Sequence, residues 1–390
     1  MKTLLSRRAM LRLSVSSVAA SSALVPRVPS WSQESAPADK SRKAKEGDVP
    51  PLATISGKPR ERGLEYGRKY WPDIRRFLDQ EIYGAFVQRP SPKDEMLRYA
   101  AACGKVVKET CPIVFQEMEG LAEGASLDLD EVVLISLHEE LHHRGVLPKV
   151  PHCTAVAVGP PTTAGDLSLV GQTWDWMQTV YGTSRVLEWR RSEGPSLLAY
   201  GFPGLWCGAG LNAAGVALTW TSARNGDAKG VRVGVPSYAL LTHLLYQESL
   251  EAAIKEAQRN KQAGWFTFVL GDAEGNLVNI EGSPTRVAVE RTKGVLTRVG
   301  FGSREMTSTA EDKPVKLHAR CDKVIELAKA SEGKVDVRGL QGHLADPSCG
   351  ISVGKGTIDM MVFDCTNRVA HLSRGPSYKT DWREFRFGKA

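Results

Sequence analysis

Apolar residues recur at helical spacing through the part of the chain that follows Gly57. They fall three and four positions apart, and Gly, Pro or Asp/Ser breaks separate the periodic segments, as expected for amphipathic helices. The pattern predicts helices over residues 60–83, 93–110, 112–123 and 129–144. Gly63 and Gly67 lie four apart in the first of these, so one face of that helix can approach a neighbour closely.

At Cys153 the period changes to two, which is typical of strands with one buried face. Strands are predicted over residues 153–158, 168–173, 185–190, 196–201, 216–222, 267–271, 277–281, 286–291, 295–299, 357–365 and 368–373. A helical pair is predicted over residues 236–256, and further helices over residues 315–330 and 337–345. Runs of antiparallel strands interrupted by blocks of helices predict an α+β fold with two sheets and helices outside them.

The first 30 residues have the features of an export signal. Arg7 and Arg8 precede residues 13–25, an apolar run rich in Ser and Ala, and this combination is typical of twin-arginine export. The run is too short for a transmembrane span. Residues 31–50 are rich in Ser, Pro, Lys and Glu, which predicts a disordered linker. We therefore expect a periplasmic protein that meets the twin-arginine machinery during export and has no integral membrane span.

The net charge of +7 lies mostly in this signal. Without residues 1–30 the chain has 46 basic and 44 acidic residues, a net charge of +2, which gives no electrostatic argument for a nucleic-acid partner. An exported protein of this size permits disulfides among its seven cysteines but does not require them. No Cys-x-x-Cys pair or His/Cys cluster indicates a metal among them.

His138, Glu139 and His142 form a His-Glu-x-x-His pattern within a predicted helix. On a helix this pattern places two imidazoles on one face with a glutamate as general base, the arrangement of many zinc hydrolases. The apolar face of the same helix is already complete, however, and no third ligand follows before the chain turns into strands. A zinc-dependent hydrolase is therefore an alternative hypothesis for this chain.

Cys153 opens the first predicted strand after the helices, and Asp175 follows the second. A free α-amine has a pKa of about 8 and a thiol one of about 8.5, so an N-terminal cysteine carries a base that matches its own nucleophile. That amine exists only if the peptide bond between His152 and Cys153 is first broken. Attack of the thiol on the His152 carbonyl, with the Thr154 hydroxyl beside it, gives a thioester that water resolves.

Four stretches of the chain carry a resemblance to a known family. They are Gly63-Leu64-Glu65-Tyr66-Gly67, Cys153-Thr154-Ala155, Gly171-Gln172-Thr173-Trp174-Asp175-Trp176 and Gly210-Leu211-Asn212-Ala213-Ala214-Gly215-Val216-Ala217. They resemble the isopenicillin N acyltransferase-like (acyl-coenzyme A:6-aminopenicillanic acid acyltransferase) family of N-terminal nucleophile (Ntn) cysteine hydrolases, over most of residues 55–375. The resemblance implies an αββα four-layer sandwich of two mainly antiparallel sheets. It also implies a cut that divides one domain into residues 51–152 and residues 153–390.

The resemblance further implies roles for single residues. Cys153 is then the nucleophile and the N-terminus of a β chain, and Asp175 is the aspartate that holds or orients its α-amine. Arg320 resembles the family arginine that faces the site, with Arg304 as its competitor.

Two positions depart from the family pattern. The family usually offers an asparagine as oxyanion donor at the end of the strand predicted over residues 295–299, and this chain has none there. Backbone amides near residues 220–222 or at Gly300 are the expected substitutes. The residue before the cut is His152, where Gly, Asn or Asp is more usual.

Trp174, Trp176, Trp206 and Trp220 lie on strands around the proposed site and predict an apolar, flat-walled pocket for an acyl or aryl chain. The sequence thus predicts an exported, self-processing enzyme that hydrolyses or transfers the acyl group of a small amide. The acyl group passes through a thioester on Cys153, and this chemistry needs no metal or cofactor. A binding protein of the same fold without turnover is the non-enzyme alternative, because the oxyanion asparagine is absent.

Overall fold

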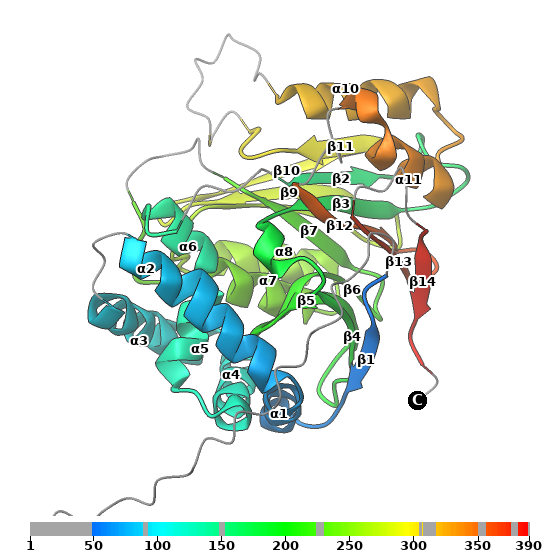
Figure 1. The fold of residues 1–390 in the computed structure, drawn as a ribbon. Coiled ribbons are helices and arrows are strands. Elements are labelled where there is room, and N and C mark those ends of the chain that lie inside the picture. Colours follow the sequence, from blue (N-terminus) through cyan, green and yellow to red (C-terminus); the bar gives the residue numbers. More distant parts are fainter. Residues whose placement is uncertain are drawn as a thin grey trace, which may run out of the picture. The chain divides into compact units, whose positions relative to one another are not determined.

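Two mainly antiparallel sheets lie face to face in the computed structural model, with helices outside each of them (Figure 1). The structure describes residues 49–88, 93–147, 153–223, 230–303, 306, 317–349, 356–375 and 381–388. The chain divides into two units between Lys43 and Ala44, and every described residue belongs to the second. The predicted export signal and all but the last two residues of the predicted linker lie outside the described residues.

The larger sheet has eight strands in the order β1-β4-β5-β6-β7-β8-β9-β10. Its strands are β1 (Leu52–Ile55), β4 (Arg185–Trp189), β5 (Leu197–Phe202), β6 (Leu205–Asn212), β7 (Ala217–Ser222), β8 (Phe266–Gly271), β9 (Leu277–Gly282) and β10 (Val287–Thr292). β1 pairs with β4 in parallel, and all the other neighbours in this sheet are antiparallel.

The smaller sheet has six strands in the order β11-β2-β3-β12-β13-β14, and all its neighbours are antiparallel. Its strands are β2 (Thr154–Val158), β3 (Leu169–Asp175), β11 (Val295–Arg298), β12 (Thr357–Asp364), β13 (Val369–Arg374) and β14 (Arg383–Arg386). The strand that follows Cys153 therefore lies inside this sheet, paired on both edges by β11 and β3.

Helices cover the outer face of each sheet (Figure 1). Outside the larger sheet lie α1 (Pro59–Phe77), α2 (Gly84–Gln88), α3 (Lys93–Thr110), α4 (Pro112–Ala125), α5 (Leu129–Ser136), α6 (His138–His143), α7 (Ser237–Leu245) and α8 (Leu250–Arg259). Outside the smaller sheet lie α10 (Ala319–Ala330) and α11 (Val337–Ala345). The order helix, sheet, sheet, helix confirms the predicted αββα sandwich.

Alternation along β2 shows why its sequence specifies an interior strand. Ala155 and Ala157 belong to the main core between the sheets, whereas Val156 and Val158 pack in a second core with side chains of α10 and α11. Both faces are apolar because both are covered, and the small alanines face the opposite sheet. By the same alternation, the side chain of Cys153 belongs to the face of β2 that is turned toward the larger sheet.

The predicted close approach of the first helix is confirmed. A Cβ atom added to Gly63 would lie 2.0 Å from the carbonyl oxygen of Glu117 in α4, and one added to Gly67 would lie 2.6 Å from that of Leu121. Backbone therefore packs directly on backbone where α1 crosses α4, which only residues without a Cβ permit.

The structure differs from the sequence prediction at several boundaries. The helix expected over residues 60–83 ends at Phe77, and a π-helical turn follows at Leu78–Tyr83. The helix expected over residues 129–144 is interrupted at Leu137, so His138 begins the separate short helix α6. Three strands were not predicted, β1, β6 and β14, because the first and last are only four residues long and β6 contains two glycines. Single turns of 3₁₀-helix occupy Gln178–Val180 and Pro347–Cys349.

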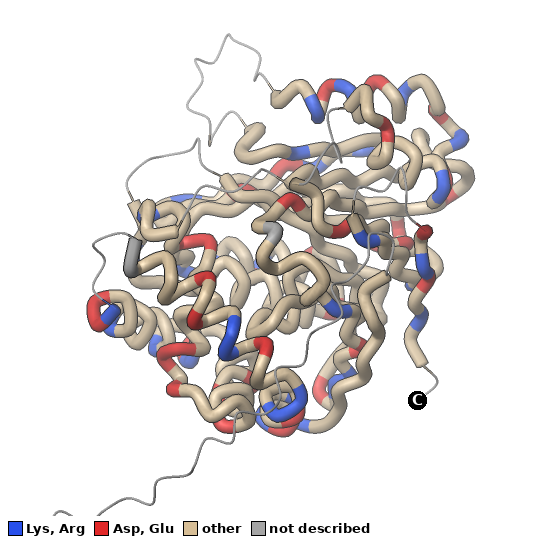
Figure 2. The backbone as a smooth tube through the Cα atoms, in the orientation of Figure 1, with Lys and Arg blue, Asp and Glu red and all other residues tan. Residues whose placement is uncertain are grey.

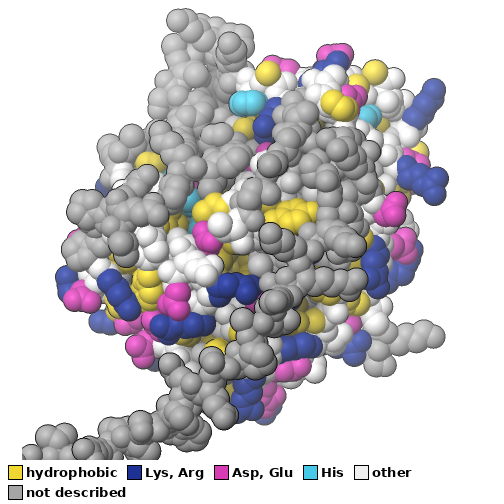
Figure 3. Space-filling model, viewed as in Figure 1, with side chains coloured by type: hydrophobic (Ala, Val, Ile, Leu, Met, Phe, Trp, Pro, Cys, Tyr) yellow, Lys and Arg dark blue, Asp and Glu magenta, His cyan; other side chains and the backbone are white. Residues whose placement is uncertain are grey.

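The surface carries charges of both signs. Figure 2 shows Lys/Arg and Asp/Glu interspersed along the outer helices, for example in α1 and α10. The face drawn in Figure 3 has the same mixture, with small hydrophobic patches between the charged side chains. Within the described residues, no helix combines the length and the apolar character that crossing a bilayer would need.

Candidate active site

Cys153 lies directly before β2, at the end of the strand pair β2–β3. Its side chain is half-buried, and its Sγ atom donates to the backbone oxygen of Asp175, 3.7 Å away. The other six cysteines are buried free thiols. Cys153 is thus the most accessible thiol of the chain.

Asp175 ends β3, and its carboxylate is held by two partners from distant parts of the chain. Nη1 of Arg320, near the start of α10, lies 3.0 Å from Oδ2, and the hydroxyl of Thr357 donates to Oδ1 at 2.6 Å. Burial raises the pKa of Asp175, while Thr357 and Arg320 oppose this by favouring the ionised form. The structure therefore brings Cys153, Asp175 and Arg320 together, whereas the competitor Arg304 lies outside the described residues.

A β-bulge places Thr357 on this carboxylate. Thr357 lies opposite Asp175 and Asp359 lies opposite Trp174, so Ile358 is one extra residue in β12. Bulges re-aim side chains in this way beside functional sites. The strand is anchored just beyond the bulge, because Asp359 accepts hydrogen bonds from Tyr200 in the other sheet (2.5 Å) and from Arg374 in β13 (3.2 Å).

The environment of the thiol disfavours its ionisation in the uncut chain. Burial, and after it the negative charge of Asp175, raise the pKa of the Cys153 thiol to about 12. The thiol is therefore protonated at neutral pH. The backbone nitrogen of Cys153 is part of the peptide bond to His152 and is not a free amine. A nucleophile in this position needs a base, and the uncut backbone supplies none.

A cavity of about 30 Å³ opens beside Cys153, with room for about two water molecules. Its lining residues are His138, Glu139, Cys153, Trp174, Asp175, Trp176, Trp220, Thr221, Ser222 and Tyr238. The ring centroid of Trp174 lies 5.9 Å from that of Trp176 and 6.0 Å from that of Trp220. Three of the four predicted tryptophans therefore form one aromatic wall at the thiol.

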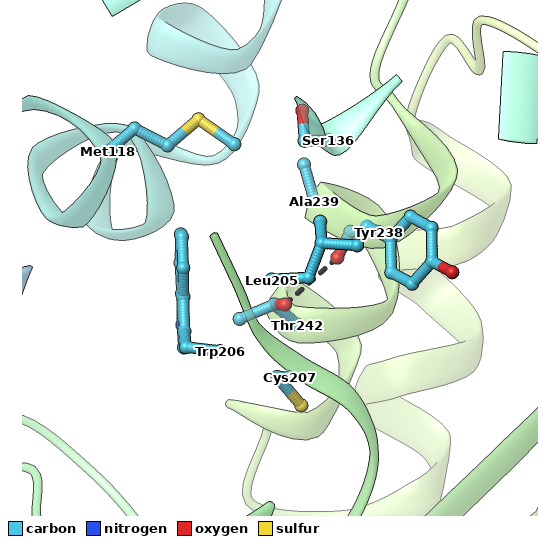
Figure 4. A pocket seen from close by; sticks show the side chains of 8 residues that line it. All are labelled: Met118, Ser136, Leu205, Trp206, Cys207, Tyr238, Ala239 and Thr242. Atoms are coloured by element: carbon cyan, nitrogen blue, oxygen red, sulfur yellow. Dashed lines mark hydrogen bonds between the residues drawn. The ribbon is translucent and has the colours of Figure 1, made fainter. Parts of the chain in front are cut away.

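Trp206, the fourth, lies elsewhere. Its ring stacks on Trp189 at 5.9 Å and borders a separate cavity of about 10 Å³ among Met118 and Thr242 (Figure 4). Sequence alone could not separate it from the others, because the two faces of β6 are both apolar. Tyr238 borders both cavities, and in Figure 4 its ring carries the hydroxyl away from the smaller one.

The residues of the His-Glu-x-x-His pattern make contacts with one another and with neighbouring side chains. The rings of His138 and His142 are neighbours, 4.5 Å apart, but Glu139 pairs with Nε2 of His143 at 3.0 Å and accepts a hydrogen bond from Ser222. Burial alone would raise the pKa of Glu139, yet His143 and the other partners lower it to about 2. Within the described residues, no group of three or more His, Cys, Asp or Glu is arranged to hold a metal ion.

His138 and Glu139 are instead part of the wall beside Cys153. The residue types and spacing of the pattern are typical of zinc hydrolases. They carry no information about where this helix lies relative to Cys153. The hydroxyl of Ser222 and the side chains of Tyr238 and Thr357 are further parts of the site that the sequence did not single out. Thr357 is 182 positions from its partner Asp175, and no local signal connects them.

Two backbone amides that the sequence suggested as oxyanion donors already have partners. The amide of Gly300 donates to the hydroxyl of Thr221 at 2.9 Å, and the amide of Trp220 donates to Oε1 of Gln172 at 3.1 Å. Thr154, predicted to assist processing, donates its backbone amide to the Thr173 hydroxyl at 3.3 Å. His152 lies outside the described residues.

Comparisons with known proteins complete this picture. A family model described as acyl-coenzyme A:6-aminopenicillanic acid acyl-transferase matches residues 162–375. The acyl-coenzyme A:6-aminopenicillanic-acid-acyltransferase 40 kDa form of Emericella nidulans is 25% identical over 225 residues, which are 56% of this chain. The chain thus spans 60% of the length of that relative.

Among solved structures, penicillin V acylase from Agrobacterium tumefaciens matches with a TM-score of 0.39 and 15% identity, over 56% of this chain and 82% of that one. A mutant of conjugated bile acid hydrolase from Clostridium perfringens matches with a TM-score of 0.38 and 13% identity, over 61% of this chain and 98% of that one.

Proposed function

Because the chain belongs to the acyl-coenzyme A:6-aminopenicillanic acid acyltransferase family, we propose that it hydrolyses or transfers the acyl group of a small amide. Cys153 is the proposed nucleophile. The observation that carries this proposal is the position of its thiol, at the backbone oxygen of Asp175 and at the mouth of an aromatic-walled cavity. Asp175, its partner Arg320 and the thiol come from three separate segments that meet only in the fold.

The first proposed step is a cut between His152 and Cys153. The Cys153 thiol adds to the carbonyl carbon of His152, and its proton passes to the Cys153 nitrogen as the C–N bond breaks. Water then hydrolyses the thioester, which releases the carboxylate of His152 and the free thiol. The cut supplies what the uncut site lacks, a free α-amine on the nucleophile itself.

In turnover the α-amine takes the thiol proton as sulfur adds to the amide carbonyl of the substrate. The same amine returns the proton to the departing nitrogen, which leaves an acyl-thioester on Cys153. Water resolves the thioester in hydrolysis, and an amine resolves it in acyl transfer. The Asp175 carboxylate, kept ionised by Arg320 and Thr357, stabilises the α-ammonium form.

The walls of the cavity favour an apolar or aryl acyl group. Trp174, Trp176 and Trp220 offer flat apolar faces, and Tyr238 packs edge-on against Trp220 with ring centroids 5.1 Å apart. At about 30 Å³ the cavity holds water but not an acyl chain, so these side chains must move apart when substrate binds.

Export is a separate part of the proposal. The paired arginines at positions 7 and 8 and the apolar run after them direct the chain through the twin-arginine machinery, which places the reaction in the periplasm. Replacing both arginines by lysine and fractionating the cells tests this, because retention of the variant inside is expected. Equal export of parent and variant would contradict it.

The cut is tested by intact mass spectrometry of the purified protein. The parent should give two fragments that meet at His152–Cys153, and the Cys153→Ala variant should stay whole. Cys103→Ala, which removes a buried thiol from α3, is the matched control and should be cut like the parent. Turnover of a panel of aryl and alkyl amides should follow the cut. An uncut parent without turnover would contradict the proposal and favour the binding protein without activity.

A further inference from the structure

Gln172 lies in β3 on the face that Cys153 shares. It pairs with Ala155 of β2, and Cys153 precedes Ala155 by two positions, so the two side chains are diagonal neighbours on one face of the sheet. Diagonal neighbours lie about 7–8 Å apart between their backbones, within reach of a long side chain. The side chain of Gln172 is fully buried.

The two ends of its carboxamide are in different situations. Oε1 accepts the backbone N–H of Trp220 at 3.1 Å, a bond that joins β3 to the opposite sheet and fixes the orientation of the amide. Nε2 is buried and has no hydrogen-bond partner among the described residues. An unpaired buried N–H group costs about 1–3 kcal/mol, so native proteins rarely keep one without a use.

The diagonal position on a shared face brings the carboxamide close to the thiol. Its interaction with Cys153 lowers the pKa of the thiol against the larger effect of burial. The residues that line the cavity at Cys153 include no asparagine, glutamine, lysine or arginine, and Gln172 is not among them but lies diagonal to Cys153 on the same sheet face. The amides of Trp220 and Gly300 already have acceptors. Gln172 is therefore the side-chain amide best placed to meet negative charge that develops at Cys153.

We propose that Nε2 of Gln172 is the side-chain donor of the oxyanion hole, in place of the asparagine that this chain lacks. The inference rests on the proposed function. As the S–C bond forms, the electron pair of the C=O double bond moves to oxygen, and the N–H of Gln172 holds that oxyanion. When the intermediate collapses, the pair returns and the amine leaves. The bond from Trp220 keeps the donor in place throughout, so no reorganisation accompanies the reaction.

The test compares four variants of the processed protein with the parent, using the best amide substrate. Gln172→Met keeps the volume but removes the donors and also the acceptor of the Trp220 N–H, and kcat should fall 10²- to 10³-fold with KM changed less than about threefold. Gln262→Met is the matched control, since it removes another buried carboxamide, one that donates to Ala257 away from the cavity. Tyr238→Phe tests the rival donor, the hydroxyl that borders the same cavity.

Gln172→Glu covers the case in which the methionine variant fails to fold, because it keeps the shape and the acceptor for Trp220. Its carboxyl donates only while protonated, so its kcat should fall as pH rises through the pKa of that carboxyl, a limb that the parent lacks. A kcat within about threefold of the parent in a folded Gln172→Met, or an unchanged pH profile in Gln172→Glu, would overturn the inference. So would a loss confined to Tyr238→Phe. Each of these outcomes leaves the proposed function intact, whereas a parent without cut or turnover contradicts the proposed function itself.

Discussion

Replacing Thr357 by valine isolates the hydrogen bond that supports Asp175. Valine has nearly the shape of threonine, and the position is 3% exposed, so the substitution removes the donor without opening a large cavity. The bond is short, 2.6 Å, and its acceptor is a carboxylate that is itself 3% exposed. A bond to a charged group in such a place contributes about 1.5–3 kcal/mol. Its loss should raise the pKa of Asp175 further, because the ionised form loses a donor.

The sign of the pH dependence follows from the direction of that change. Folding already raises the pKa of Asp175, so its ionisation reduces stability as pH rises from the unfolded pKa to the folded pKa. The variant should therefore match the parent at low pH and fall behind it by about 1.5–3 kcal/mol above the folded pKa. The acid limb of kcat/KM should move to higher pH, because Asp175 acts as the ionised form.

Urea unfolding near pH 4 and near pH 8, together with a pH–rate profile, measures both effects. Thr242→Val is the matched control, since its hydroxyl is also buried but donates to a neutral carbonyl, that of Tyr238, at 2.9 Å. Its loss should be about 1 kcal/mol at either pH. An equal loss at both pH values in Thr357→Val, or an unmoved acid limb, would refute the role given to this bond.

Further predictions concern the surroundings of the site. Arg320→Met should lower kcat/KM near neutral pH about tenfold or more by raising the pKa of Asp175. Arg320→Lys should restore part of the lost activity, and equal activity of the two variants would argue against a role for the ion pair. Glu139 contributes stability above its unfolded pKa that is lost as pH falls toward and below about 2, so Glu139→Gln should flatten the dependence of the free energy of unfolding between about pH 5 and pH 3, by ~1.5 kcal/mol over that range. Gly63→Ala should destabilise the fold by about 3 kcal/mol or more in urea unfolding, because its Cβ would lie 2.0 Å from a backbone oxygen. Gly342→Ala in α11 is the control. Its Cβ meets nothing within 4 Å, so it should stabilise the fold by about 0.5–1 kcal/mol. Trp206→Phe should change KM less than about twofold, and a larger change would place substrate in the smaller cavity.

The strands that the sequence predicted well are short apolar segments with turn residues on either side. β2 is an example, since small alanines and larger valines alternate along it and pack in separate cores. The short edge strands β1 and β14 escaped prediction because four residues carry too little pattern, and their pairing comes from partners more than a hundred positions away in the case of β1. The apolar pattern continues without a break from residue 129 to residue 144, yet the helix is interrupted at Leu137. Tertiary packing rather than helix propensity decides this break.

For the site, local motifs led to Cys153 and Asp175 but not to their surroundings. The stretch from Gly171 to Trp176 resembles a motif of the family, yet the partner of the Gln172 amide, Trp220, lies on the other sheet, and only the packed structure supplies it. Trp206 shows the opposite failure, because residue type and strand position suggested a pocket wall while the side chain points to the helices. What decides such cases is the face of the sheet, which periodicity cannot give when both faces are apolar.

The interleaving of the segments before and after Cys153 has a consequence for how the molecule survives heating. β1 is paired with β4, and side chains from both segments form the main core. After the proposed cut these become two polypeptides held only by that shared interior, so unfolding releases two molecules from one. The melting temperature of the cut protein should then rise with its concentration, while that of the uncut chain should not. Refolding of the cut protein is also bimolecular, because the two polypeptides must associate again. A protein that folds once as a single chain would then regain its structure slowly or not at all after denaturation.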